Sequence, residues 1–166
     1  MAQPIFQQSL PKMKVNKERA WIVLLLLIRI WLGYRLISAS YSSVVDIIFH
    51  PKERAFFEKW FGQELHFPMP LLMAFLAKGA ELLGGFLVLI GLLTRFGASL
   101  IAFTMLIATL VANLGENWPI DGGFTISYTL FALLFVLQGG GKYSVDALIN
   151  SYKRPNQQKE AAFHIS

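Results

Sequence analysis

The chain has no cysteine and only three histidines among its 166 residues. Without cysteine it can form no disulfide, ligate no iron–sulfur cluster and attach no c-type haem. The histidines, His50, His66 and His164, lie outside the apolar runs, so no pair of them can hold a b-type haem within a membrane. The sequence therefore predicts no haem or iron–sulfur cofactor bound by this chain alone.

Charge is also scarce, because only 15% of the residues are charged, against roughly a quarter in an average soluble domain. Apolar residues make up 55% of the chain, and they gather in runs at 21–38, 71–93, 96–114 and 124–137. The first three runs approach the roughly 20 residues that a membrane-spanning helix needs, and the fourth reaches that length with its flanks. We therefore expect an all-α membrane four-helix bundle with helices at about 20–40, 71–93, 96–114 and 120–140.

The basic residues predict how the chain crosses the membrane. Nine Lys and Arg residues lie in the first 19 residues, at Arg95 and in the tail from residue 142, whereas three lie in the other loops. Because positive loops stay in the cytoplasm, both termini are expected there, in the inner membrane of a prokaryote. The net charge of +5 thus reflects orientation, and no nucleic-acid partner is expected. The expected division is a cytoplasmic segment 1–19, a transmembrane domain 20–141 and a cytoplasmic tail 142–166.

The first outer loop, 41–70, is too long to be a simple connection between antiparallel helices. Phe56, Phe57, Trp60 and Phe61 recur at helical spacing among charged residues, a pattern typical of an interfacial amphipathic helix. This helix is expected to lie flat on the outer face. It either forms a lid over a site or only covers the end of the bundle.

Four charged residues stand inside the first two apolar runs. Arg29 and Glu81 each lie near the midpoint of a run, so we expect them to pair between antiparallel helices, because an isolated charge at that depth is costly. Arg35 and Lys78 are expected nearer the outer surface, with Asn113 at the mouth, where they either line a cationic pocket or snorkel to headgroups. The candidate site therefore comprises Glu81 as a catalytic proton carrier and Arg29, Arg35, Lys78 and Asn113 as ligand-binding residues. Glu81 is the only carboxylate within the apolar runs, so no metal centre is expected there.

Three motifs resemble those of one known family. The segment 29–33, Arg-Ile-Trp-Leu-Gly, resembles the R-x-x-L-G opening of DoxX-type membrane proteins. The segment 81–95 resembles their E-L-x-G-G…G-L-x-T-R core, and 139–146 resembles their closing G-x-G-x-x-S-x-D. One departure is that Ala39-Ser-Tyr-Ser-Ser43 stands where members commonly have a glycine followed by a lysine.

This resemblance implies a four-helix protein of the cytoplasmic membrane that works with redox partners, since the family includes subunits linked to quinol oxidases and to a thiosulfate:quinone oxidoreductase. The leading hypothesis is a membrane subunit of a quinone-linked redox assembly, with a quinone or small anion bound between the first two helices. At most it is a subunit of an oxidoreductase, because it has no evident electron carrier. A non-enzymatic scaffold of a larger complex and a small-anion transporter are the alternatives. Expected partners are the lipid bilayer and either other subunits or further copies of the chain.

Overall fold

The computed structural model describes residues 17–112 and 123–152, and every regular element in these ranges is helical. In chain order these elements are α1 (Lys17–Phe49), α2 (Pro51–Lys59), the π-helical turn η1 (Trp60–Glu64), α3 (Pro70–Ile90), α4 (Thr94–Ile107), its π-helical continuation η2 (Ala108–Ala112) and α5 (Gly123–Gln138). A short helix over 145–152 follows. In the described residues, three helices are long and apolar enough to cross a membrane, and α5 is a shorter apolar helix. The predicted all-α membrane fold is confirmed.

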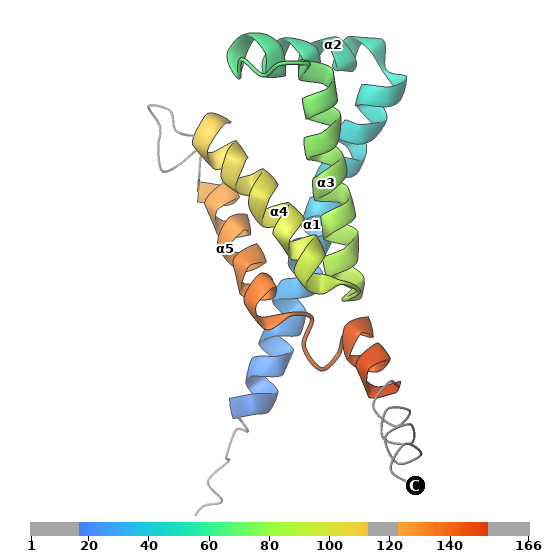
Figure 1. Ribbon diagram of the computed structural model, residues 1–166, viewed down its shortest axis with the longest axis vertical. Coiled ribbons are helices and arrows are strands. Elements are labelled where there is room, and N and C mark those ends of the chain that lie inside the picture. The colour runs from blue at the N-terminus through green and yellow to red at the C-terminus, as the bar shows by residue number, and fades with distance from the viewer. Residues whose placement is uncertain (1–16, 113–122, 153–166) are drawn as a thin grey trace, which may run out of the picture.

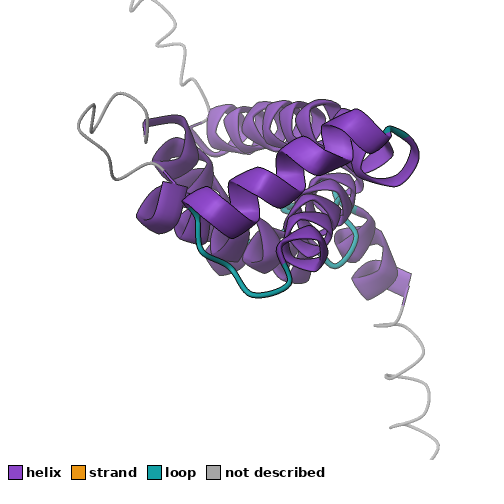
Figure 2. Ribbon diagram, turned by 90° about the horizontal axis from the view of Figure 1, so that it is seen from above, coloured by secondary structure: helices purple, strands orange, loops and turns teal. Residues whose placement is uncertain are grey.

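The four apolar helices pack in sequence. Helix α1 packs against α3, α3 against α4 and α4 against α5, whereas α1 contacts α5 only lightly. The amphipathic helix α2 and the turn η1 lie across one end of this bundle, as the loop pattern predicts (Figures 1 and 2). The start of α1 and the helix 145–152 extend from the opposite end (Figure 1). Both ends of the described chain therefore lie on one side of the bundle and α2 lies on the other.

Helix α1 is longer than expected, because it continues to Phe49 instead of ending near residue 40. Pro51 then begins α2, where a proline is tolerated because the first helical position needs no amide hydrogen bond. The longer helix changes the part of α1 that lies beside α3. Gly33 lies against Gly85, and Ser40 reaches Glu81.

Glycines let three helix backbones approach closely. A Cβ atom on Gly33 would lie 2.8 Å from the carbonyl oxygen of Gly85, which joins α1 to α3. A Cβ atom on Gly84 would lie 2.7 Å from the carbonyl oxygen of Gly97, which joins α3 to α4. The adjacent glycines at 84 and 85 thus give α3 a close contact with a helix on each side.

The buried apolar side chains form two clusters. The larger one fills the space between α1, α3, α4 and α5, and includes Leu32, Val88, Ile101 and Phe135, each at most 1% exposed. The smaller one lies beneath α2 and η1 and is built on Ile47, Phe61 and Ala74. Because Phe61 belongs to the second cluster, η1 is fastened to the ends of α1 and α3.

Two glycines of α3 provide a matched test of this packing. We predict that Gly84→Ala lowers the free energy of unfolding by about 1–3 kcal/mol, because the methyl group overlaps the α4 backbone. Gly79→Ala should raise it by up to about 1 kcal/mol, because no atom lies within 4 Å of the added carbon and alanine favours a helix. Thermal unfolding in detergent measures both. Equal effects of the two substitutions would contradict the close contact of α3 with α4.

Candidate functional site

A cavity of about 390 Å³ lies between α3 and α4, beneath η1 and the loop that follows it. Its volume falls in the range of roughly 300–1,000 Å³ that is typical of small-molecule sites. The wall is mostly apolar and is formed by Met73, Leu76, Ala77, Lys78, Ala80 and Glu81 of α3, Leu100, Phe103, Thr104, Ile107, Ala108 and Val111 of α4 and η2, and Trp60, Phe61, Leu65 and Phe67 at the capped end. The predicted pocket between the first two spanning helices is therefore misplaced by one helix, because close glycine contacts fill the space between α1 and α3.

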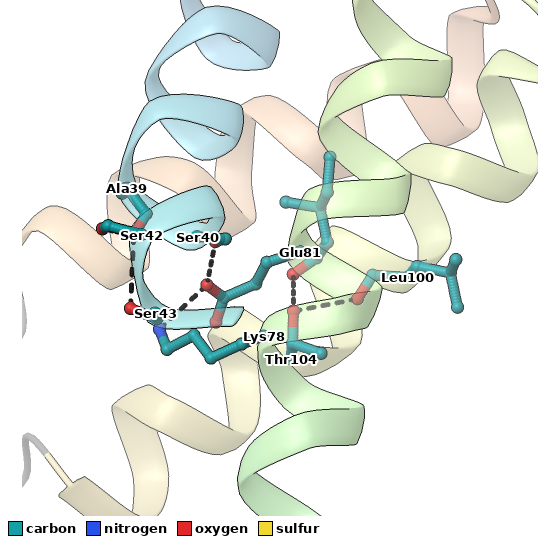
Figure 3. A network of polar contacts seen from close by, with 9 residues as sticks. Ala39, Ser40, Ser42, Ser43, Lys78, Glu81, Leu100 and Thr104 are labelled. Atoms are coloured by element: carbon teal, nitrogen blue, oxygen red, sulfur yellow. Dashed lines mark hydrogen bonds and ion pairs between the residues drawn. The ribbon is translucent and has the colours of Figure 1, made fainter. Parts of the chain in front are cut away.

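Glu81 is the buried charge of this site and is only 4% exposed. Its Oε2 atom accepts a hydrogen bond of 2.7 Å from the hydroxyl of Ser40 on α1 and one of 2.9 Å from the ammonium of Lys78 (Figure 3). Both contacts use the same oxygen, so neither occupies Oε1. The carboxylate is held in place on one side and retains acceptor capacity on the other.

Lys78 forms the more accessible half of the pair. Its side chain is 25% exposed, whereas that of Glu81 is 5% exposed. An ammonium group has three hydrogen-bond donors, and the contact with Glu81 uses one of them. The hydroxyl of Thr104 donates to the carbonyls of Leu100 and Ile101, which leaves its lone pairs free to accept (Figure 3). A polar group in the cavity can thus receive a hydrogen bond from Lys78 and donate one to Glu81.

The cavity opens sideways, between the helices. Leu76, Phe103 and Val111 border it and are 53%, 64% and 45% exposed, respectively. These apolar residues belong to helices that are long enough to span a membrane. Apolar residues exposed on the surface of these helices therefore border the cavity.

Both π-helical segments of the described chain border this cavity. Trp60 and Phe61 come from η1, and Ala108 and Val111 come from η2. Single π-helical turns frequently occur at functional sites, where the wider turn redirects side chains. The two segments enclose the cavity from its capped end and from its α4 wall. Two of the four aromatic residues that predict an interfacial helix, Trp60 and Phe61, therefore also line the cavity.

Arg29 lies away from this site, so the predicted ion pair with Glu81 is wrong. Arg29 is 5% exposed and donates hydrogen bonds of 2.5 and 2.7 Å to the carbonyl oxygens of Gly140 and Tyr143. Ser40, the α1 residue that does reach Glu81, is eleven residues further along, or about 16 Å of helix. Helix α1 therefore faces the midpoint of α3 with a segment that lies beyond the midpoint of the first apolar run.

Arg29 instead belongs to a contact that we call the C-terminal latch, formed by residues 139–146 against the ends of α3 and α4. Asp146 accepts hydrogen bonds of 2.8 and 2.9 Å from the amides of Leu93 and Thr94, and one of 2.9 Å from the hydroxyl of Thr94. In return, the amide of Asp146 donates to the carbonyl of Gly91 at 3.0 Å. The carboxylate thereby caps the start of α4, where helix amides have no partner within the helix.

The remaining predicted site residues lie elsewhere. Arg35 is exposed on α1 and does not line the cavity, and Asn113 lies outside the described residues. Of the predicted set, the structure brings only Lys78 and Glu81 together at the cavity. The cationic surplus that suggested an anion pocket is absent from the described wall, because Lys78 and Glu81 are its only charged residues there and their charges cancel.

Sequence reasoning missed Ser40 and the capping role of Asp146. The serine-rich segment 38–43 held a signal for the first, because a hydroxyl facing Glu81 is a natural partner for a buried carboxylate. Asp146 closes the G-x-G-x-x-S-x-D motif, but the sequence gives no indication that it caps a helix 52 residues earlier in the chain.

Comparison with known proteins gives two matches. The family model described as DoxX matches residues 24–114. An uncharacterized protein of Haemophilus influenzae is 36% identical to this chain, with the match covering 55% of this chain and 71% of that protein. No solved structure matches. The residues that the family model matches include the close glycine contacts, Lys78 and Glu81.

The pairing of Lys78 with Glu81 predicts strong coupling between the two positions. Lys78→Met should lower the free energy of unfolding by about 1.5–3 kcal/mol, because it leaves a buried carboxylate without its charged donor. The double variant Lys78→Met/Glu81→Gln should lose less than the sum of the single losses. Thermal unfolding of the four proteins measures the coupling, with exposed Glu53→Gln as a control. Additive losses would show that the two residues do not interact.

The C-terminal latch predicts a dependence on pH. Burial raises the pKa of Asp146, but the hydrogen bonds from Thr94 and Leu93 lower it more, and the charge of Arg29 adds to the lowering. The net pKa therefore lies below its ordinary value of about 3.9. A lowered folded-state pKa contributes stability that is complete above the ordinary value and is lost as pH falls through the folded value.

We therefore expect Asp146→Asn to lower the free energy of unfolding by about 0.5–2 kcal/mol at pH 7. The gap between wild type and variant should stay constant down to about pH 5 and shrink below about pH 4. Unfolding measured across this range gives the gap directly, and Glu64→Gln, at an exposed residue of η1, serves as a control. A gap that widens on acidification would refute the role of the ionised carboxylate.

Proposed function

This chain belongs to the DoxX family of membrane proteins, and from that premise we propose that it is the quinone-binding subunit of a redox assembly in the cytoplasmic membrane. The observation that supports this proposal most strongly is the laterally open apolar cavity with Lys78 and Glu81 in its wall. A quinone has a hydrophobic body and two polar oxygens at its head. The cavity offers a matching apolar wall and one charged pair.

The residues present fit such a head group. Lys78 retains donors that can bind a carbonyl oxygen, and Oε1 of Glu81 can accept a hydrogen bond from a hydroxyl. The hydrogen bond from Ser40 fixes Glu81 while its free oxygen remains available. In this proposal Glu81 holds or releases a proton at Oε1, and Lys78 stabilises negative charge on the ligand oxygen.

When bound, the quinone supplies the electron chemistry, and the chain supplies binding, orientation and proton exchange. The sequence has no cysteine and no evident electron carrier, so the proposal assigns the supply of electrons to a partner protein that carries a redox group. The basic residues at both ends of the chain support a cytoplasmic location for the two termini. The side covered by α2 and η1 is then the outer face.

Two other functions have less support from the structure. A scaffold subunit requires packed helices but has no need for a cavity that combines a charged pair with a lateral opening. A small-anion transporter is disfavoured because the charges of Lys78 and Glu81 cancel in the described wall. The apolar lining is also poorly suited to a hydrated anion, since burying a polar group without partners is costly.

Trp60 in the cavity wall provides a direct binding test. In a variant that keeps Trp60 and replaces Trp21, Trp31 and Trp118 by phenylalanine, decylubiquinone added to lipid nanodiscs should quench the fluorescence in a saturable manner. Glu81→Gln should weaken binding roughly tenfold or more, since a charged hydrogen bond contributes about 1.5–3 kcal/mol.

Two alanines provide the matched control for this test. Ala80→Leu should abolish the saturable phase by filling the cavity, whereas Ala55→Leu on the exposed surface of α2 should leave it unchanged. Quenching that rises linearly with quinone, with the same slope in every variant, would reflect partition into lipid and would refute the site.

A further inference from the structure

The side of α1 that faces away from the bundle carries a charge that the described chain does not neutralise. Arg35 is exposed and forms no hydrogen bond or ion pair with any residue in 17–112 or 123–152. Another arginine of this helix, Arg29, points to a different side of the helix and is buried in the C-terminal latch. The two arginines within the apolar run of α1 therefore have different roles.

Arg35 stands well inside the apolar part of α1. Apart from the buried Arg29, the nearest charges along α1 are Arg19 and Asp46, which lie 16 and 11 residues away. These separations correspond to about 24 and 16 Å along the helix. Two apolar residues on this face, Leu24 and Trp31, are each 46% exposed. A guanidinium on such a surface is costly in hydrocarbon unless a negative group meets it.

The surroundings of Arg35 can accommodate another helix. Ser38, Ala39 and Ser42 are small, exposed and on the same face of α1, so they allow close helix approach. Trp31 contacts α5 through Tyr128 at a ring separation of 5.7 Å. Beyond that contact, α1 and α5 diverge toward the α2 end of the bundle (Figure 1). Arg35 is thus one turn past the point where the chain covers its own helix.

A second copy of the chain cannot supply the missing charge. Glu81 is the only carboxylate within the apolar runs of the sequence. It is 4% exposed and already binds Lys78 and Ser40. A homodimer would therefore bring two unpaired arginines together or leave each of them in contact with lipid.

From these observations we infer that the side of α1 around Arg35, which faces away from the bundle, binds a transmembrane helix of a different protein. That helix presents an aspartate or glutamate at the depth of Arg35. The arginine and the carboxylate form an ion pair that neither protein can form alone. Ser38, Ala39 and Ser42 let the two helices approach closely around that pair. This surface is separate from the cavity, so the inference does not depend on the proposed quinone site.

The test is crosslinking in the protein's own membranes. The photoreactive residue p-benzoylphenylalanine replaces Tyr34, an aromatic residue next to Arg35 that is 63% exposed, and the adducts are identified by peptide mass spectrometry. We expect an adduct with an apolar helix of another protein that contains Asp or Glu. Arg35→Leu should reduce the yield at least fivefold, and Arg35→Lys should retain more than half of it. Arg35→Glu should abolish the adduct, and replacing the partner's carboxylate by lysine should restore it.

The same photoreactive residue at Leu130, which is 61% exposed on α5, is the matched control. Adducts there should not change when Arg35 is replaced. Adducts at position 34 with lipid alone would show that lipid covers this surface, and adducts with a second copy would show self-association. Either result overturns the inference, as does a protein adduct that is insensitive to Arg35→Leu or lacks a membrane carboxylate. Because Arg35 is exposed, its replacement should leave the unfolding temperature nearly unchanged, which confirms that lost crosslinking is not unfolding.

Discussion

The contact between Gly33 and Gly85 sets the register of α1 on α3, and the polar chemistry of the molecule depends on that register. Because each glycine faces the other's backbone, the two helices approach too closely to hold a ligand between them. The same register brings Ser40 to Glu81 and directs Arg29 to the far end of the bundle. The glycine at position 84 repeats this contact toward α4. The cavity therefore forms where α3 and α4 separate toward the capped end.

The family motifs have different roles within this arrangement. The arginine that opens the first motif and the aspartate that closes the last meet in the C-terminal latch, which closes the end of the bundle opposite α2. The middle motif contributes both the glycine contacts and Glu81. Motif residues that are far apart in the sequence thus maintain the architecture, whereas the Lys78–Glu81 pair is available for chemistry. A shared fold does not by itself fix the activity of the proteins that have it.

Much of the fold could be predicted from the sequence, because apolar run length and the pattern of the first loop follow directly from membrane physics. Lys78 and Glu81 could also be identified, since charges in an apolar run need an explanation. The residue of α1 that contacts Glu81 could not be identified from the sequence. The prediction placed Arg29 opposite Glu81 by matching the midpoints of two runs, but α1 is helical to Phe49 and faces α3 with a different segment. Helix register depends on close packing between glycines, and an apolar run does not encode it.

The ligand that the protein carries when it is extracted from its own membranes is the most direct test of the cavity. Native mass spectrometry of the wild-type protein should show an adduct with the mass of a prenylated quinone. The cavity-filling variant Ala80→Leu should lack this adduct, and the surface variant Ala55→Leu should keep it. A wild-type chain without any quinone, or equal quinone occupancy in the wild type and Ala80→Leu, would contradict the assignment of the cavity between α3 and α4 as the binding site.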